Sequence, residues 1–358
     1  MPQDDRSERH GLISRRTFMR RSVAGAVGLA LGEGLLAEAA SHARPAARPA
    51  RAPSRVVLVR DSRVIDASGK VQQPLLQEML GRALTTLTGK STIGDAWGEF
   101  VKPGEVVGLK LNANSVSQLR GSELTTHFPA LTSAVLSGFA QAGITEENVV
   151  LWERSDEELA STGHSVQKDP GALRVVGTRE SRRGSRGPGF SSESFAVGGR
   201  SSRVSRIATD MCSALINVPV LKDHGVTGIT GAMKNHYGSI DNPRQYHGNN
   251  GTRPGVAEVN AIPVLREKQR LVLFDALLGV YNGGPRWQRQ YIWPYGGILV
   301  GTDPVAIDAV ALGILDEKRQ AEGMNSLASR AAHLDAAEIL GLGNRDLDQI
   351  DLVEVVLG

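Results

Sequence analysis

Short apolar runs alternate with longer amphipathic segments along most of the chain. The runs are rich in Val, Leu and Ile and show little polar alternation, which is typical of strands buried on both faces of a sheet. They cover residues 56–59, 106–112, 148–153, 214–221, 270–277 and 296–303. Between them, apolar residues recur at helical spacing in residues 74–87, 128–143 and 304–320. This order predicts an α/β fold, with a mainly parallel sheet covered by helices on both faces in Rossmann-like layers.

One segment interrupts the alternation. Residues 178–206 are rich in Gly, Ser and Arg, and we expect them to form a long insertion at the surface, such as a hairpin. Their arginines are either solvated or help to hold an anionic ligand. Because no internal repeat is apparent, residues 56–358 are expected to form a single α/β domain.

The first 43 residues have the features of an export signal. SRRTFMR precedes the weakly apolar segment VAGAVGLALGEGLLAEAA, and small residues follow it. The paired Arg15 and Arg16 resemble a twin-arginine (Tat) signal. We expect cleavage at Ala39 or Ala43, or retention of the segment as a membrane anchor. The Tat export machinery is then a partner, and the protein is periplasmic or otherwise extracytoplasmic. Contact with a membrane is expected only through an uncleaved signal.

The basic charge of the chain is concentrated near its N-terminus. Residues 44–55 form a linker rich in Pro, Ala and Arg, a composition typical of a stiff, solvated tether. Residues 1–55 contain ten Arg and five acidic residues, which leaves 31 basic and 33 acidic residues in the rest of the chain. A nearly neutral domain lacks the electrostatic footprint of a nucleic-acid-binding protein. No nucleic-acid partner is expected.

The cysteine content limits the cofactors that the chain can hold by itself. Cys212 is the single cysteine in the sequence. It excludes an intramolecular disulfide, a zinc site built on cysteines and a self-contained iron–sulfur cluster. A divalent metal remains possible, held by His, carboxylate or carbonyl ligands, and the identity of any cofactor stays open. Cys212 itself precedes an apolar strand and is expected to be a small buried residue.

The segment LKDHGVTGITGAMKNHYGSI, residues 221–240, concentrates candidate chemistry. Lys222, Asp223 and His224 follow a predicted strand, and ligands of parallel sheets bind beyond the carboxyl ends of strands. Glycines and threonines come next, and Asn235 follows them. Together they are candidates for binding a phosphate or carboxylate. The set consists of Gly225, Thr227, Gly228, Thr230, Gly231 and Asn235. The spacing fits neither a Walker loop nor a dinucleotide-binding fingerprint. Alternatively, the glycines only form a tight turn.

Three aspartates are candidate metal ligands. Asp223 and Asp275 lie at the ends of predicted strands, and Asp308 has apolar neighbours in a predicted helix, where a carboxylate needs a partner. If they converge at one edge of the sheet, they form an oxygen-rich site for a divalent ion. A salt bridge from Asp308 to Lys222 or Lys234 is the alternative.

A basic residue in an earlier strand adds to this site. The segment KLNAN, residues 110–114, ends the predicted apolar strand at residues 106–112 and includes Lys110 and Asn112. Because a charge in an apolar strand is costly unless it is paired, Lys110 is expected to reach an anion or an acidic side chain. Lys110 and Asn112 are therefore candidate substrate-binding residues.

The segment NVPVLKDHGVTGITGAMKNHYGSI, together with GGILVGTDPVAIDAVALGIL, resembles the domain of unknown function 362 (DUF362) family. The resemblance extends from about residue 56 to the C-terminus. It implies no established activity. Some relatives carry an added ferredoxin-like module and are named iron–sulfur proteins for that reason, but this chain lacks the necessary cysteines.

Two functions are compatible with these residues. The first is an exported, metal-assisted enzyme that acts on a small anionic substrate, with His224, Lys222 and Lys234 as the catalytic candidates. The second is a non-catalytic extracytoplasmic protein that binds an anion or another ligand, or assists assembly. Carboxylates that converge on one cavity favour the first function. Lysines that converge while the carboxylates scatter favour the second.

Overall fold

The computed structural model describes residues 12–13, 52–179, 187–197, 199–247 and 252–358. The expected Tat signal and most of the linker lie outside the described residues. The exception is a two-residue strand, β1 (Leu12–Ile13), which pairs with the C-terminal strand. The first strand of the domain begins at Ser54, slightly inside the expected linker.

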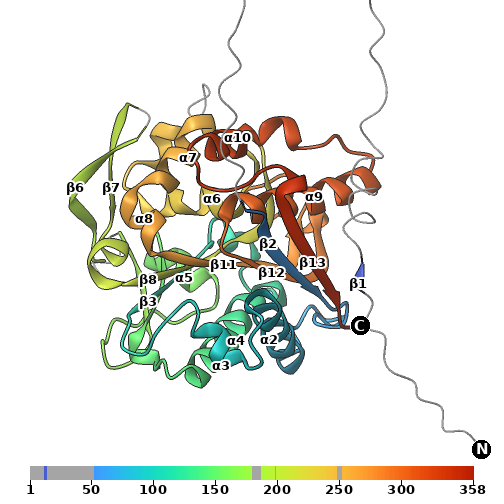
Figure 1. Ribbon diagram of the computed structural model, residues 1–358, viewed down its shortest axis with the longest axis horizontal. Coiled ribbons are helices and arrows are strands. Elements are labelled where there is room, and N and C mark those ends of the chain that lie inside the picture. The colour runs from blue at the N-terminus through green and yellow to red at the C-terminus, as the bar shows by residue number, and fades with distance from the viewer. Residues whose placement is uncertain (1–11, 14–51, 180–186, 198, 248–251) are drawn as a thin grey trace, which may run out of the picture.

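A mixed, mainly parallel sheet forms the centre of the molecule (Figure 1). Its strands are β2 (Ser54–Arg60), β3 (Val107–Leu111), β4 (Val149–Glu153), β5 (Arg174–Gly177), β8 (Ala214–Val218), β9 (Val220–His224), β10 (Gly228–Ile229), β11 (Gln269–Val280), β12 (Ile292–Gly301) and β13 (Ile350–Val356). The order is β1-β13-β2-β12-β11-β8-β3-β4-β5, with β9 pairing with β11 and β10. The main antiparallel member is β12, which runs against both β11 and β2. The expected α/β fold is confirmed.

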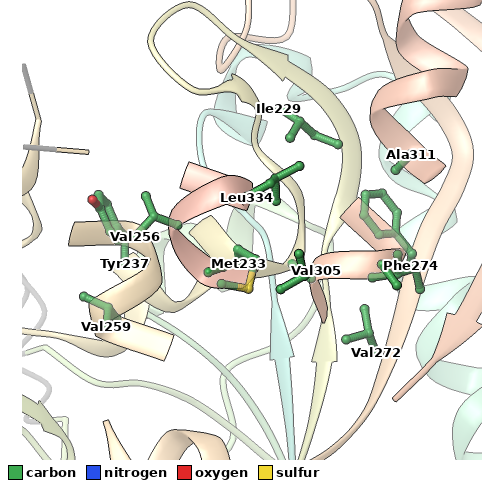
Figure 2. Close-up of a cluster of buried hydrophobic side chains, with 14 of the residues drawn as sticks. Ile229, Met233, Tyr237, Val256, Val259, Val272, Phe274, Val305, Ala311 and Leu334 are labelled. Carbon is green, nitrogen blue, oxygen red and sulfur yellow. The ribbon is translucent and has the colours of Figure 1, made fainter. Parts of the chain in front are cut away.

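Helices cover both faces of this sheet (Figure 1). On one face lie α2 (Gln73–Thr88), α3 (Ile93–Trp97) and α4 (His127–Gln141); on the other lie α6 (Gly231–Asn235), α7 (Thr252–Ala261), α8 (Pro263–Lys268), α9 (Pro304–Ala321) and α10 (Ala332–Ile339). Because side chains alternate along a strand, β11 contributes Leu273 to the core beneath α2 and α4 and Phe274 to the other core. Figure 2 shows Phe274 in that second core, with Met233 of α6 and Val305 of α9.

The apolar run at residues 214–221 is not one strand. It breaks at Pro219, which separates β8 from β9, because proline cannot donate a hydrogen bond within a sheet. The Lys-Asp-His sequence, expected at the carboxyl end of a strand, forms the last three residues of β9. There Asp223 pairs with Ile229 and His224 with Gly228 of the short strand β10.

The Gly/Ser/Arg-rich segment contains a hairpin. Strands β6 (Phe190–Val197) and β7 (Arg200–Ser205) form a separate two-stranded antiparallel sheet. Residues 180–186 and 198 of this segment lie outside the described residues. Among the described helices, none combines the length and apolar character that crossing a membrane requires.

Candidate functional site

A polar pocket of about 320 Å³ lies at the carboxyl ends of three strands, β3, β4 and β9. Its walls include the side chains of Asn112, Glu153, Arg154, His224, Lys234 and His247. We call it the inner pocket. The chain proceeds from β3 to β4 and β5 in one direction, whereas β8 returns to the other side of β3. The pocket therefore lies beside a reversal of strand order, which is the usual ligand site of an open α/β sheet.

A second depression of about 810 Å³ adjoins the inner pocket, and we call it the outer cleft. The two share Arg154, Pro243 and Arg244, and the outer cleft adds Arg179. Burial and the positive charge of Arg154 lower the pKa of Arg179. Cationic side chains thus border both the inner pocket and the space that adjoins it.

Asp308 of α9 holds the short helix α6 in place. Its two carboxylate oxygens accept hydrogen bonds from the backbone N–H groups of Ala232, at 2.6 Å, and Met233, at 2.9 Å. Burial raises the pKa of Asp308 to about 7. Gly231, with φ of 50°, precedes these residues, and a Cβ at that position would collide with the Asp308 carboxylate. Asp308 and Gly231 therefore form a helix cap that positions Lys234 and Asn235.

Lys234 projects from α6 into the inner pocket. Its Nζ donates to Nε2 of His247 at 3.1 Å and lies 4.5 Å from the centre of the Tyr237 ring. Burial, assisted by the nearby charge of Arg154, lowers the pKa of Lys234 to about 7. No carboxylate within salt-bridge distance pairs with Lys234 among the described residues. A buried cation without a counter-ion gains from a bound anion.

Two neutral histidines flank Lys234. Nδ1 of His224 accepts hydrogen bonds from the backbone N–H groups of Val226, at 3.1 Å, and Thr227, at 3.3 Å, so this nitrogen carries no proton. Burial and the Lys234 charge lower the pKa of His224 to about 2. In His247, Nδ1 donates to the carbonyl of Pro243 at 2.9 Å, which leaves Nε2 as the acceptor for Lys234. Burial also lowers the pKa of His247.

Lys110 and Glu153 form a buried ion pair beneath the inner pocket, at 2.9 Å. Lys110 also donates to the carbonyl of Leu111 at 2.6 Å. Burial acts to raise the pKa of Glu153, but the charges of Lys110 and Arg154 outweigh burial and hold the pKa below its usual value. The expectation that Lys110 reaches an acidic side chain agrees with this contact. Its charge is already compensated, so Lys110 supports the pocket and leaves ligand contact to other groups.

Lys222 lies behind the pocket wall. Its Nζ donates to the carbonyl of Asn114 at 3.0 Å and sits 5.1 Å from the centre of the Trp287 ring. Burial lowers its pKa to about 7. Asn114 lines the inner pocket, whereas Lys222 is not among the residues of its wall.

The three candidate metal ligands do not converge. Asp223 accepts from the backbone N–H of Gly284 at 2.7 Å, and burial raises its pKa to about 6. Asp275 pairs with Nδ1 of His127 at 2.6 Å on the face covered by α4, whereas Asp308 caps α6 on the opposite face. No group of three His, Cys, Asp or Glu side chains in the described part of the chain could hold a metal ion. The expected convergence of the carboxylates is therefore wrong.

The glycine-rich loop contributes less to the pocket than expected. Thr230 and Asn235 line it, as does Asn112 of the earlier strand segment. Thr227 donates instead to the carbonyl of Ile229, and the backbone N–H of Gly225 donates to the carbonyl of Gly284. At Gly228, φ is 73° and an added Cβ would lie 2.8 Å from the carbonyl of Leu327. Gly225, Thr227 and Gly228 thus shape the turn between β9 and β10, in line with the alternative that the glycines form a turn.

Several pocket residues escaped sequence reasoning. They are Glu153, Arg154, Gly238 and Arg244. Glu153 and Arg154 end a predicted strand, so the rule that led to Lys222 would also have found them. Gly238 has a steric role, since an added Cβ would lie 2.9 Å from the Lys110 Nζ. No sequence signal marks Arg244, because the loop that carries it reaches the pocket only through the fold.

Comparison with known proteins identifies a family. No curated protein matches the chain. A crystal structure of a Thermotoga maritima protein, a target of the Northeast Structural Genomics Consortium, is similar at 10% sequence identity with a TM-score of 0.40. The similarity covers 76% of this chain and 60% of that one, so this chain spans less than two thirds of its length. The model of the family described as "Domain of unknown function (DUF362)" matches residues 107–313, more than half of the sequence. The chain therefore belongs to the DUF362 family.

Proposed function

We propose that the inner pocket binds a small anion and that this binding is the function of the domain. The observation that carries the proposal is the environment of Lys234, a buried amino group whose hydrogen-bond partner is a neutral imidazole at 3.1 Å. A bound oxyanion would supply the missing counter-charge. Arg244, which also lines the pocket, adds favourable potential for a negative ligand.

The carboxylates near the site do not oppose this proposal. Glu153 is neutralised by Lys110, and Arg154 forms an ion pair with Glu158. Asp223, Asp275 and Asp308 have partners elsewhere, so a metal-assisted mechanism lacks its ligand set among the described residues. Anion binding is thus better supported than metal-assisted catalysis.

Proton transfer to or from a bound anionic substrate is a second candidate. A lysine with a pKa near 7 can act as a general acid or base at neutral pH. Lys234 would exchange the proton with the substrate, and His247 would accept the hydrogen bond that orients the ammonium group. Exchange of C–H protons of small carboxylates in D₂O, followed by NMR, tests this candidate. Exchange that is lost in Lys234→Met would favour catalysis over binding alone.

We also propose that the domain works outside the cytoplasm. The proposal rests on the paired Arg15 and Arg16 and on the weakly apolar segment that follows them. A substrate or ligand would then be a small anion of the periplasm or another extracytoplasmic space.

The test of anion binding is calorimetric titration of the purified protein with inorganic phosphate. We expect saturable binding to the wild type and a loss of at least tenfold in affinity in Lys234→Met, which removes one buried charge-assisted contact. The matched control is Lys90→Met, because Lys90 is an exposed lysine far from the pocket in the sequence and paired with Glu99. Equal affinities in the wild type and both variants would exclude the inner pocket as the site.

A further inference from the structure

The turn between β9 and β10 holds the imidazole of His224 in one tautomer. Nδ1 of His224 accepts hydrogen bonds from the backbone N–H groups of Val226, at 3.1 Å, and Thr227, at 3.3 Å. Because this nitrogen accepts, a neutral ring carries its proton on the other nitrogen. Burial, followed by the charges of Lys234 and His247, lowers the pKa of His224 to about 2, so the ring is neutral. Nε2 of His224 is therefore an N–H donor.

This donor is accessible from the inner pocket. His224 lines the pocket, whereas Val226 and Thr227, which hold the Nδ1 side of the ring, do not. The side of the ring that meets the pocket is thus the one away from the turn, where Nε2 lies. Nε2 of His224 has no hydrogen-bond partner in the described part of the chain and, unlike Nε2 of His127, is not fully buried. A ligand in the pocket can therefore reach it.

Lys234 supplies a second donor in the same wall. Its Nζ donates to Nε2 of His247 at 3.1 Å, and the ring centres of His247 and His224 are 6.2 Å apart. All three side chains line the inner pocket. Nε2 of His247 is already occupied by Lys234, so the ammonium group of Lys234 and the N–H of His224 remain to bind a ligand. Oxyanions are the ligands that such neighbouring donors hold best.

We propose that His224 is a ligand-binding residue, which donates a hydrogen bond from Nε2 to an unprotonated oxygen of the anion in the inner pocket. The inference rests on the proposed anion-binding function and adds a second residue that selects the ligand. Carboxylates and phosphate fit, because they offer acceptor oxygens to both His224 and Lys234. A metal ion or a substrate proton would need a free lone pair on the ring. His224 has none in this tautomer, since the turn engages Nδ1 and a proton occupies Nε2.

Two substitutions separate the two nitrogens of the ring. His224→Asn keeps an acceptor near the position of Nδ1 and removes the Nε2 donor, whereas His224→Gln keeps a donor near the position of Nε2 and removes the acceptor. In calorimetric titration with inorganic phosphate, His224→Asn should lose roughly 10- to 100-fold in affinity, the range expected for one hydrogen bond to a charged ligand. His224→Gln should lose clearly less. The thermal transitions should show the opposite order, with His224→Gln the less stable variant, because its turn lacks the acceptor.

NMR spectra of the histidine rings test the tautomer and the contact in the wild-type protein. We expect an unprotonated Nδ1 and a protonated Nε2 in His224 between about pH 5 and 9, a range in which an ordinary histidine gains its second proton. Added phosphate should shift the Nε2 resonance of His224. A residue that only shapes the turn would show no such shift.

The outcomes separate the inference from the proposed function. A proton on Nδ1, or a ring that becomes doubly protonated at about pH 6, would overturn the assignment of His224 as a donor. The inference is also wrong if phosphate binds to the wild type and to a folded His224→Asn variant with equal affinity, while anion binding by Lys234 stands. If His224→Asn does not fold, an Nε2 resonance that phosphate leaves unmoved has the same meaning. If phosphate does not bind to the wild type, both the inference and the proposed function fall.

Discussion

The central prediction concerns the pH dependence of anion binding and its loss in Lys234→Met. Burial and the Arg154 charge hold the pKa of Lys234 near 7 in the free protein, so the side chain loses its charge above that pH. A bound anion favours the charged ammonium form and raises this pKa. Binding above pH 7 must therefore take up a proton, and affinity should fall as the pH rises.

The magnitude follows from linkage. Between the pKa of Lys234 in the free protein, about 7, and its higher pKa in the complex, affinity should fall about tenfold for each pH unit. Below the lower value it should level off, because the lysine is already charged. His224 and His247 have lowered pKa values and stay neutral over this range. Lys222, Asp308 and Glu158 also have pKa values of about 7, so the experiment must separate their titration from that of Lys234.

Calorimetric titration with inorganic phosphate between about pH 7.5 and 9 tests this prediction, since phosphate remains mostly the same dianion there. Buffers of different ionisation enthalpy report the protons taken up, which should approach one per bound anion near the upper end of the range. Lys234→Met should bind weakly with little pH dependence, and Lys222→Met should keep the slope. An affinity independent of pH in the wild type, without proton uptake, would refute the role given to Lys234.

Four further predictions concern the support of the site and the export of the chain. Asp308→Ala leaves two buried backbone N–H groups without an acceptor, so we expect a loss of roughly 2–6 kcal/mol in the free energy of unfolding by urea; an unchanged midpoint would show that Asp308 is not a cap. Lys110→Met should cost about 3–5 kcal/mol by stranding the buried Glu153 carboxylate, and adding Glu153→Gln should restore much of it; additive losses would contradict the pairing. Treatment with EDTA should leave phosphate affinity unchanged, and a decrease that zinc or magnesium reverses would revive the metal-assisted reading. Replacing Arg15 and Arg16 by Lys should keep the precursor inside the cell, as judged by fractionation and immunoblotting, whereas undiminished export would exclude the Tat route.

The fold was predictable because its strands are buried on both faces. Continuous apolar runs such as residues 106–112 and 148–153 have few other interpretations in a chain of this composition. The break at Pro219 was not predicted, although proline interrupts the ladder of a central strand. The antiparallel direction of β12 was not visible, because its apolar run reads the same in either direction.

The candidate site was only partly predictable. Residues 221–240 contribute to the pocket as expected, since strand ends in a parallel sheet point to ligand sites. The partners of the buried carboxylates are set by contacts between segments that are distant in the sequence. Asp308 accepts a hydrogen bond from Ala232 of α6, 76 positions away in the chain. Asp275 is hydrogen-bonded to His127, 148 positions away. A sequence shows that a buried carboxylate needs a partner, but only packing decides whether that partner is a metal, a histidine or a helix end.

A structure of crystals of the protein soaked with arsenate would test the central claim most directly, because arsenic gives an anomalous signal that locates the bound anion. We predict an anomalous peak in the inner pocket, with an arsenate oxygen within hydrogen-bond distance of Lys234 Nζ. An empty inner pocket in crystals that bind arsenate elsewhere would contradict the account.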